Sequence, residues 1–357
     1  MPAQGGKLIP CPICEPLAVQ DRKGTKVQQQ LSAALKALAL GTSIVLSAVG
    51  LTGCSESTEG QTITVVGHDS FVFSKEMAAE FRAQTGITVR VLKQGDAGSL
   101  TNKLVLTKGN PIADAVFGID NTFASVATGA GVIDGDLKPV DFGDVCFNYD
   151  KQWFVDHSVA APTSWQQLTD PAYAGLTVIE NPSSSSTGLA FLATTVGSLG
   201  EGSWQRWWTA LKANGVTVSA GWEDAYYTQF SGTADAVGTH PIVLSYSSSP
   251  AYEVRDNGES ATTSILGDCF RQTEYAGVLT NAKHKAAAQK LVDFLLGKSF
   301  QKQIPDTMYV YPIDASVALP DDWAKWAPAA TSVTDDSKLN IDANRSKWLS
   351  DWDAIFG

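Results

Sequence analysis

The sequence predicts an α/β protein with two lobes joined by two strands. Three observations support this fold class: a strand–helix–strand–helix–strand pattern over residues 62–120, a second α/β set that starts near Pro162, and two strand-like segments that separate the two sets. Parallel neighbours need a helical crossover between them, so the first pattern indicates a mostly parallel sheet.

The first 53 residues have the features of a secretory signal peptide that is removed. Arg22, Lys23 and Lys26 precede a mostly apolar segment over residues 31–51, which Lys36 interrupts. The clean apolar part is short for a membrane-spanning helix, so a retained anchor is the weaker alternative. A polar segment over residues 54–61 is expected to form a flexible tether to the folded part.

The segment Leu51-Thr52-Gly53-Cys54 resembles the lipobox of bacterial lipoproteins. In that motif the signal peptidase cuts before the cysteine, whose sulfur and new amino group are then acylated. The resemblance implies lipidation at Cys54, an extracytoplasmic location (periplasmic or cell-surface) and contact with the membrane through a lipid anchor only. A cysteine placed there by chance is the alternative.

The charge of the exported part argues against nucleic acid as a partner. Without residues 1–53 the chain keeps 21 of its 26 basic and 35 of its 37 acidic residues, a net charge near −14. Besides Cys54, that part contains two cysteines, Cys146 and Cys269. Exported compartments permit oxidation, which favours a disulfide between them, and two buried free thiols are the alternative.

The first α/β set follows from alternation and capping signals. The strand TITVV precedes a helix that Ser74 is expected to cap and Gly86 to close. After the strand ITVRVL, Ser99 is expected to cap the next helix. The nearly continuous apolar segment ADAVFGI predicts a strand that is buried on both faces.

Three loops follow these predicted strands. They are GHDSF (67–71), QGDAGS (94–99) and GIDNT (118–122). In parallel α/β sheets, ligands bind beyond the carboxyl ends of the strands. We therefore expect the three loops to converge on one rim.

A Gly- and Pro-rich segment over residues 129–139 marks the predicted crossing between lobes. The strand-like VDFGDVCFNYD follows it, and CFRQTEYAGVLT marks the return crossing, after which residues 283–303 predict one long amphipathic helix. These boundaries assign residues 62–143 and 275–357 to lobe 1 and residues 144–274 to lobe 2.

Motifs of catalysis are absent from the sequence. The contiguous His68-Asp69-Ser70 cannot fold back into a triad, and the chain has neither GxSxG nor HExxH. The segment NPSSSSTGLAF (181–191) places hydroxyls before a predicted helix, as in an anion site, although a polar loop with one capping serine is equally consistent. We predict a binding protein, with no catalytic residue, cofactor or metal.

Two segments combine aromatic rings with carboxylates in loop-like surroundings. They are GWEDAYYTQFSG (221–232) and LSYSSSPAYE (244–253). Packing in the core is the alternative for such rings. Rings and carboxylates together suit a flat cation, with a cation–π attraction of roughly 0.5 to 2 kcal/mol per contact. The candidate groups are the rings of Trp222, Tyr226, Tyr246 and Tyr252 and the carboxylates of Asp96, Glu223 and Asp224.

An ordered set of segments resembles the thiamine-binding proteins of bacterial ABC importers, which belong to the two-lobed type II periplasmic binding proteins. The segments are HDSF, GDAGSLTNKL, GIDNT, NPSSSSTGL, GWEDAY, LSYSSSPAY and IPDTMYVYPI, and the similarity covers nearly all of residues 62–357. The resemblance implies a ligand cleft between lobes joined by two hinge strands. It also implies a monomer that binds thiamine or a thiamine phosphate and delivers it to an ABC permease.

The resemblance also implies a set of ligand-binding residues. Asp96 falls on an acidic position that contacts the ligand, and Ser185 and Ser186 fall on hydroxyls around the hydroxyethyl or phosphate end. His68 and Tyr309 stand where the family commonly has Tyr and Trp, and both keep a flat ring. The full set is His68, Asp96, Ala97, Ser185, Ser186, Trp222, Tyr246, Ser247, Ser248, Ser249, Pro250, Tyr252 and Tyr309.

Other ligands and another class of function stay open at this point. Tyr226-Tyr227 resembles the adjacent tyrosines of ferric-iron-binding proteins of the same fold, in which His68 or a carboxylate would complete the metal shell. Acids and rings also suit a polyamine. An exported hydrolase or transferase is the remaining alternative, although no nucleophile–base arrangement is present.

Overall fold

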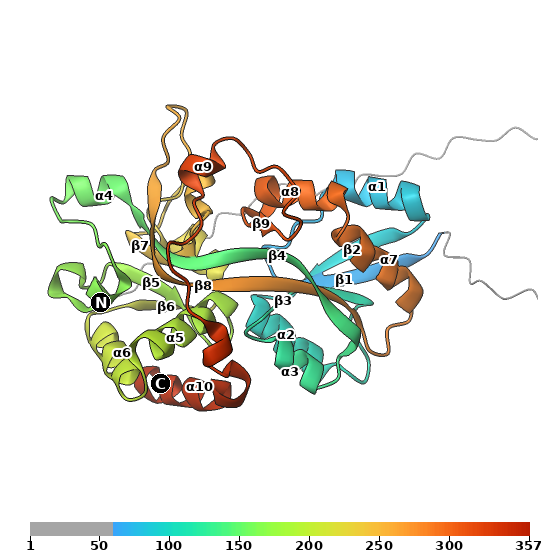
Figure 1. Cartoon of the computed structure of the whole chain (residues 1–357), viewed down its shortest axis with the longest axis horizontal. Coiled ribbons are helices and arrows are strands. Elements are labelled where there is room, and N and C mark those ends of the chain that lie inside the picture. The colour runs from blue at the N-terminus through green and yellow to red at the C-terminus, as the bar shows by residue number, and fades with distance from the viewer. Residues whose placement is uncertain (1–59) are drawn as a thin grey trace, which may run out of the picture. The chain divides into compact units, whose positions relative to one another are not determined.

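A computed structural model describes residues 60–357 (Figure 1). The predicted signal peptide, the lipidation site Cys54 and most of the tether lie outside the described residues. Within the described part, no helix combines the length and apolar character that crossing a membrane requires.

A nine-stranded sheet organises the described part. Its strands are ordered β2-β1-β3-β8-β4-β7-β5-β6, and β9 pairs with β4 off this path. The strands β2, β1 and β3 are parallel, as are β7, β5 and β6. Between these two groups of parallel strands, the long strands β8 and β4 pair antiparallel to each other in the same sheet. The α/β fold with two lobes is therefore as predicted, and the two lobes share one continuous sheet.

The first lobe is built around β1, β2 and β3. Alternate residues of β1 point to opposite sides: Ile63 and Val65 pack with α1 and the later helices α7 and α8, whereas Val66 packs with α2. All residues of β3 are buried, as the apolar segment predicts. The elements are β1 (Thr62–Gly67), α1 (Lys75–Thr85), β2 (Thr88–Lys93), α2 (Ala97–Leu106), β3 (Ala115–Asp120) and α3 (Ala124–Gly129).

The caps of the first two helices differ from the prediction at one position. The Ser74 side chain accepts from the backbone N–H of Met77, and Gly86 closes α1 in the left-handed conformation, both as predicted. The prediction that Ser99 caps the next helix is wrong. Asp96 caps α2, three residues earlier, by accepting from the backbone N–H of Ala97 at 2.6 Å.

Two strands of 18 residues each, β4 (Ile133–Asp150) and β8 (Thr262–Leu279), cross between the lobes. Most of the Gly- and Pro-rich segment 129–139, which was expected to mark the crossing, belongs to β4 itself, because its backbone pairs with β8 around a register shift. The cysteines predicted to pair are joined by a disulfide that links β4 at Cys146 to β8 at Cys269.

The second lobe is built around β5, β6 and β7. One face packs on α5 and α6, through residues such as Ile179 and Leu244, while the other face packs on η3 through Val178 and Val243. The elements are α4 (Lys151–Asp156), η1 (Trp165–Thr169), η2 (Pro171–Tyr173), β5 (Thr177–Glu180), α5 (Ser186–Leu199), α6 (Ser203–Ala213), β6 (Thr217–Ser219), η3 (Asp224–Gln229), β7 (Ile242–Tyr246) and η4 (Ser249–Ala251).

The single long helix predicted over residues 283–303 is two helices. The first, α7 (Lys285–Leu295), is separated from α8 (Lys298–Met308) by Gly297, whose extended backbone interrupts the helical hydrogen bonds. The helical spacing of apolar residues continues across this break, because both helices pack an apolar face against the same side of the first-lobe sheet. The remaining elements are β9 (Tyr311–Pro312), α9 (Trp323–Trp326), η5 (Asp336–Lys338) and α10 (Ile341–Phe356).

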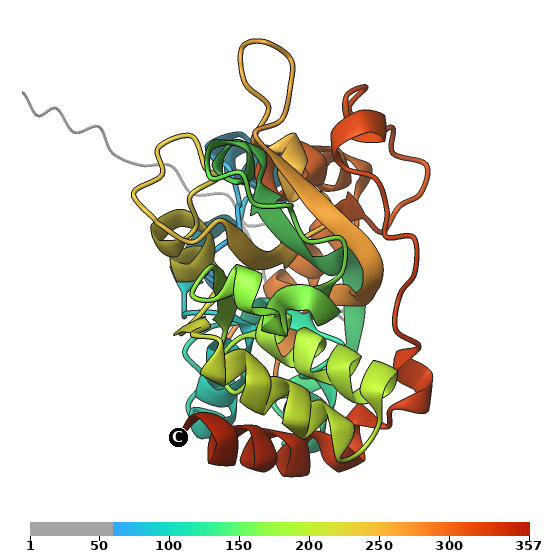
Figure 2. The same ribbon diagram turned by 90° about the vertical axis from the view of Figure 1, so that its left-hand side faces the viewer.

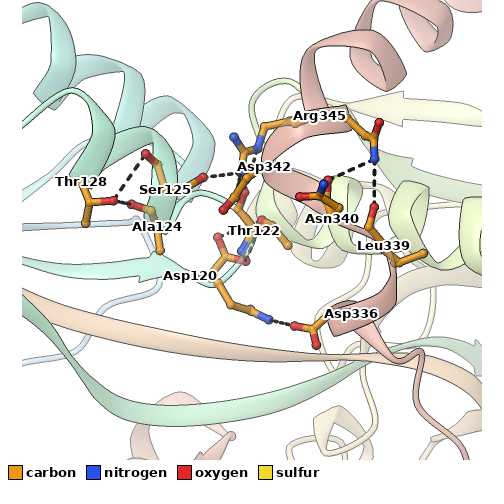
Figure 3. A network of polar contacts seen from close by, with 12 residues as sticks. Asp120, Thr122, Ala124, Ser125, Thr128, Asp336, Leu339, Asn340, Asp342 and Arg345 are labelled. Atoms are coloured by element: carbon orange, nitrogen blue, oxygen red, sulfur yellow. Dashed lines mark hydrogen bonds and ion pairs between the residues drawn. The ribbon is translucent and has the colours of Figure 1, made fainter.

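The C-terminal segment contacts both lobes. After α9 it runs down one side of the sheet to α10, which lies beside α6 (Figure 2). Trp352 of α10 packs edge-on against Trp208 of α6. The contact with the first lobe is made by the buried Arg345 of α10. It donates to the carbonyl of Thr122 and the hydroxyl of Ser125, both at 2.9 Å (Figure 3). This segment is a third connection between the lobes, besides β4 and β8.

Candidate functional site

A cavity of about 420 Å³ lies where loops of both lobes meet. Its first-lobe wall comes from the loops after β1 and β2 and from the end of α8. Its second-lobe wall comes from residues 220–227 and from the segment after β7. Loops that follow parallel strands thus supply much of the lining, as the fold predicts.

Only two of the three loops expected at the rim line the cavity. Residues of GHDSF and QGDAGS do so, but none of GIDNT does. The reason is local packing of the third loop: Asn121 binds the backbone of Thr273, and the carbonyl of Thr122 accepts from Arg345. The third loop therefore stays outside the lining and reaches the site only through Gly118, which lies against the ring of His68.

Aromatic rings form a continuous wall across both lobes. Trp222 stacks on Tyr226 with ring centroids 4.8 Å apart and an interplanar angle of 18°. From there the contacts continue to Tyr227 and Tyr252, and Tyr252 meets Tyr309 of the first lobe at 4.7 Å. All five rings line the cavity. The rings of Trp222, Tyr227, Tyr252 and Tyr309 are partly exposed and offer flat faces to a ring-shaped ligand, whereas Tyr226 is 1% exposed and packs behind Trp222.

Hydrogen bonds fix the orientation of Trp222. Its indole Nε1–H donates to the hydroxyl of Ser245 at 2.9 Å, and that hydroxyl lies 2.8 Å from the hydroxyl of Ser249. Both serines are buried at the end of β7 and the start of η4. Two serines of the segment LSYSSSP, Ser245 and Ser249, thus hold the indole in place through hydrogen bonds.

Asp96 joins the two lobes at the edge of the cavity. One carboxylate oxygen, Oδ2, accepts from the hydroxyl of Ser185 and from the backbone N–H of Trp222, both at 2.8 Å. The other, Oδ1, accepts from its own helix at Ala97 and lies 3.5 Å from the backbone nitrogen of Ser186. The N-termini of α2 and α5 therefore share one carboxylate, which stabilises the contact between the lobes.

His68 and Glu274 form a buried ion pair in the cavity wall, with 3.1 Å between Nε2 and Oε1. Burial alone would lower the pKa of His68, but the neighbouring carboxylate of Glu274 outweighs it and raises the pKa. The His68 ring lies against Gly118 of β3. A Cβ at Gly118 would come within 2.0 Å of this ring, and φ at Gly118 is +88°.

Negative charge predominates around the cavity. Its lining contains the basic groups Lys93 and His68, and the amine of Lys93 donates to the backbone carbonyl of Asp69. The acidic groups of the lining are more numerous: Asp69, Asp96, Glu223, Asp224 and Glu274. Such a cavity favours a cationic ligand over an anionic one.

Eight of the thirteen predicted ligand-binding residues line the cavity: His68, Asp96, Ser186, Trp222, Tyr246, Ser249, Tyr252 and Tyr309. The other five are buried beside it. Of these, Ser185 binds Asp96, and Ser248 donates to the backbone carbonyl of Tyr309 at 2.6 Å. Ala97, Ser247 and Pro250 are likewise not part of the lining.

Some lining residues were missed in the sequence. Glu274 lies within β8, where a single acid in a strand gives no signal of its own, and its partner His68 is 206 residues away. Thr307 and Met308 end α8 next to Tyr309. Tyr309 is left-handed, with φ of 53°. Thr307 and Met308 line the cavity because α8 ends at Met308 with a left-handed residue after it, and the sequence pattern did not indicate this helix end.

Among residues 60–357, no group of three or more His, Cys, Asp or Glu side chains is placed to hold a metal ion. Tyr226 donates to Glu253 at 3.2 Å. Burial, followed by the negative charge of Glu253, raises the pKa of Tyr226 well above its usual range. Burial and the nearby Tyr252 also raise the pKa of Tyr227. In the metal-free protein, burial therefore favours the neutral form of both phenols.

A family model described as "Bacterial extracellular solute-binding protein" matches residues 117–338, more than half of the chain. The chain belongs to this family. Members of this solute-binding family bind a ligand outside the cytoplasm, and the two relatives described next are named as binding proteins, not as enzymes.

Curated relatives of this solute-binding protein include two named "Thiamine-binding periplasmic protein". The one from Salmonella typhimurium is 29% identical over 313 residues, which cover 81% of this chain and 92% of the relative. The one from Escherichia coli is 28% identical with the same coverage. A solved "Periplasmic thiamin binding protein" superposes with a TM-score of 0.73 at 25% identity, over 83% of this chain and 96% of that one.

Proposed function

We propose that this solute-binding protein captures thiamine or a thiamine phosphate outside the cytoplasm and delivers it to an ABC permease. The observation that carries the proposal is a cavity in which the aromatic wall of both lobes meets an excess of carboxylates. Thiamine combines a flat aminopyrimidine with a permanently cationic thiazolium, and these two parts need stacking and negative charge, respectively. The names of the relatives and of the superposed structure support the same ligand.

The proposal includes a lipoprotein precursor. Cleavage before Cys54 and acylation there would tether the folded part to the membrane surface through residues 54–61, with the ligand-loaded monomer docking on the permease. Metabolic labelling with a radioactive fatty acid tests this step. Label in the wild-type protein and none in Cys54→Ser is expected, and equal labelling of both would contradict lipidation at Cys54.

Calorimetric titration of the purified mature protein tests the ligand. We expect saturable binding of thiamine, and no saturable binding of spermidine or Fe(III). Iron binding would also give the visible colour of ferric phenolate. Binding of spermidine or Fe(III) without thiamine would overturn the proposal.

Replacing Trp222 by Ala tests the aromatic wall. Loss of the indole removes a ring that contacts Tyr226, Tyr227 and Tyr246 and leaves Ser245 without its donor, so we expect thiamine affinity to fall at least about tenfold, or roughly 1.4 kcal/mol. Trp153→Ala is the matched control, because Trp153 stacks on His157 and does not line the cavity. An affinity unchanged in Trp222→Ala, or lowered equally in both variants, would remove the wall from the binding site.

A further inference from the structure

A row of three acids lies in the cavity wall next to His68. Glu274 of β8 is in register with Asp120 of β3 on one side and with Asp141 of β4 on the other. Residues that oppose each other in an antiparallel pair point to the same face of the sheet, so the three side chains are neighbours. Glu274 lines the cavity, and its Oε1 lies 3.1 Å from Nε2 of His68. His68 therefore contacts the middle member of the row.

Hydrogen bonding indicates which acid of the row carries a proton. Both carboxyl oxygens of Asp141 are buried, and no donor among the described residues reaches them. The hydrogen-bond partner of Asp141 is the carboxyl group of Glu274, and two carboxyl groups bond only when one of them carries a proton. Asp141 therefore donates as the neutral acid. Glu274, which also bonds to the His68 ring, accepts as the carboxylate.

Carboxylates face His68 from three segments of the chain. They belong to Glu274 of β8, to Asp69 in the loop after β1 and to Asp96 at the start of α2. Burial lowers the pKa of His68, but these three acids together outweigh burial and raise it. In the ligand-free protein, carboxylates of the same cavity therefore hold His68 in its cationic form.

The neighbours of His68 on β3 are uncharged. They are the ring of Phe117, with ring centroids 5.6 Å apart, and Gly118, where an added Cβ would meet the imidazole. Lys93 also lines the cavity, and its amine donates to the backbone carbonyl of Asp69. Because lysine keeps its proton far above neutral pH, His68 is the basic group of this lining that can change its charge near pH 7.

A cationic ligand and the proton of His68 compete for the same carboxylates. The cavity has a volume of about 420 Å³, and both His68 and Glu274 line it, so a ligand that fills the cavity lies near both. A second positive charge at such a distance disfavours the protonated imidazole. His68 can lose the proton on Nδ1 while Nε2–H still donates to Glu274. The wall then keeps its hydrogen bond, and the charge of Glu274 remains for the ligand.

This competition concerns how the ligand's charge is recognised and rests on the proposed function. We propose that entry of the cationic ligand drives the release of one proton from His68 to the solvent, and that the affinity therefore rises with pH. His68 acts as a specificity-determining group, because its proton holds the place of the ligand's positive charge in the ligand-free protein. Below the raised pKa of His68 the proton opposes binding, and above it the competition ends.

Calorimetric titration with thiamine at pH 6.5, in two buffers of different ionisation enthalpy, counts the protons released. We expect at least about half a proton per thiamine, because the raised pKa leaves His68 more than half protonated at this pH. The same linkage should raise the thiamine affinity at least about threefold from pH 6 to pH 7. Binding without proton release would overturn this inference and leave the proposed function standing. No binding at any pH would overturn the proposed function, and this inference with it.

Two variants test whether His68 is the group that releases the proton. His68→Gln keeps a side-chain N–H that can donate to Glu274 but cannot titrate, so we expect proton release to fall below about one fifth of the wild-type value. Asp120→Asn is the matched control, because burial raises the pKa of Asp120 to about 7 and Asp120 does not line the cavity. We expect this variant to release protons as the wild type does. Release that persists in His68→Gln, or that disappears in Asp120→Asn, would overturn the assignment to His68.

A measurement on the wild-type protein keeps the inference testable if His68→Gln does not fold. The chain has four histidines, whose imidazole C–H resonances are followed by NMR as the pH is changed. We expect the pKa of one histidine to fall by at least about one unit when thiamine is bound, which is a tenfold change in proton affinity. Unchanged pKa values of all four histidines in the thiamine complex would overturn the proposal.

Discussion

His68 and Glu274 show how a single pair of residues keeps charge inside the cavity wall. Both side chains are nearly buried, with exposed fractions of 12% and 11%. On the neighbouring strands, Asp120 and Asp141 lie in register with Glu274, and burial raises the pKa of Asp120 to about 7 and that of Asp141 well above its usual range. Glu274 differs from these two acids. Burial alone would raise its pKa, but the neighbouring His68 has the larger effect, and the pKa of Glu274 is lowered. His68 therefore favours the charged form of Glu274, whereas burial favours the neutral forms of Asp120 and Asp141.

This pair should give the protein a pH-dependent stability. The raised pKa of His68 contributes stability that is complete below the unfolded value of about 6.5 and is lost as pH rises through the folded value. The lowered pKa of Glu274 contributes stability above its unfolded value of about 4.3. Asp96 and Asp69 face His68 as well and act in the same direction as Glu274.

We expect His68→Gln to lose about 1 kcal/mol of unfolding free energy at pH 5.5, the usual difference between a charged and a neutral hydrogen bond. The deficit should shrink as pH rises above neutrality, because wild-type His68 then loses its proton. Urea unfolding of both proteins from pH 5 to pH 9 measures this. A deficit that is constant over this range would show that His68 acts by packing alone.

At the level of elements, β4 and β8 determine how the two lobes are joined. Each strand pairs within both lobes, and a disulfide joins them at Cys146, in the part of β4 that pairs with β7, and Cys269. Thr334 of the C-terminal segment donates to the carbonyl of Cys269 at 2.8 Å. The three connections between the lobes therefore come together near this disulfide.

Loss of the disulfide should lower the unfolding free energy by about 4 kcal/mol, because it closes a loop with a sequence separation of 123 residues. The double variant Cys146→Ser, Cys269→Ser, compared with the oxidised wild type by urea unfolding, measures this. Adding reductant should destabilise only the wild type. Equal stability of the two proteins without reductant would mean that the crossing strands hold the hinge unaided.

Much of the fold was predictable from the sequence because its signals are local. The apolar segment of β3, the Ser74 cap and the Gly86 stop depend on residues close in the chain. The cap of α2 was mispredicted because Asp96 and Ser99 are both good capping residues, and contacts with Ser185 and Trp222 favour Asp96. Such contacts join residues about 90 or more positions apart, which no local pattern reports.

The same distinction applies to the site. Rings and serines in 221–252 were recognisable as a group because they are neighbours in sequence. Glu274 and the end of α8 were not, since their role depends on how β8 and α8 pack. Likewise, the sequence indicated that Asp96 belongs to the site, but its bonding to the second lobe required the folded arrangement.

At the level of the whole molecule, the two lobes are in contact beside the cavity. Gly98 of α2 faces Ser184 of the second lobe, and a Cβ at Gly98 would lie 2.8 Å from the Ser184 backbone and 2.8 Å from the ring of Phe123. Ser70 of the first lobe also donates to Glu223 of the second, at 3.2 Å. If ligand binding requires this closed arrangement, the space at Gly98 becomes a condition for affinity.

We expect Gly98→Ala to weaken thiamine binding about tenfold, because backbone atoms cannot yield and the lobes must separate, which reduces the binding-competent fraction. Calorimetry gives the affinity, and small-angle scattering shows whether saturating thiamine still compacts the variant to the wild-type radius of gyration. Gly109→Ala is the control, since no atom lies within 4 Å of an added Cβ there. Repeating the change in a Phe123→Leu background removes the clash within the first lobe, so a loss of affinity that persists there reports the contact with Ser184. Wild-type affinity in Gly98→Ala would mean that the cavity binds its ligand without the lobes closing at this point.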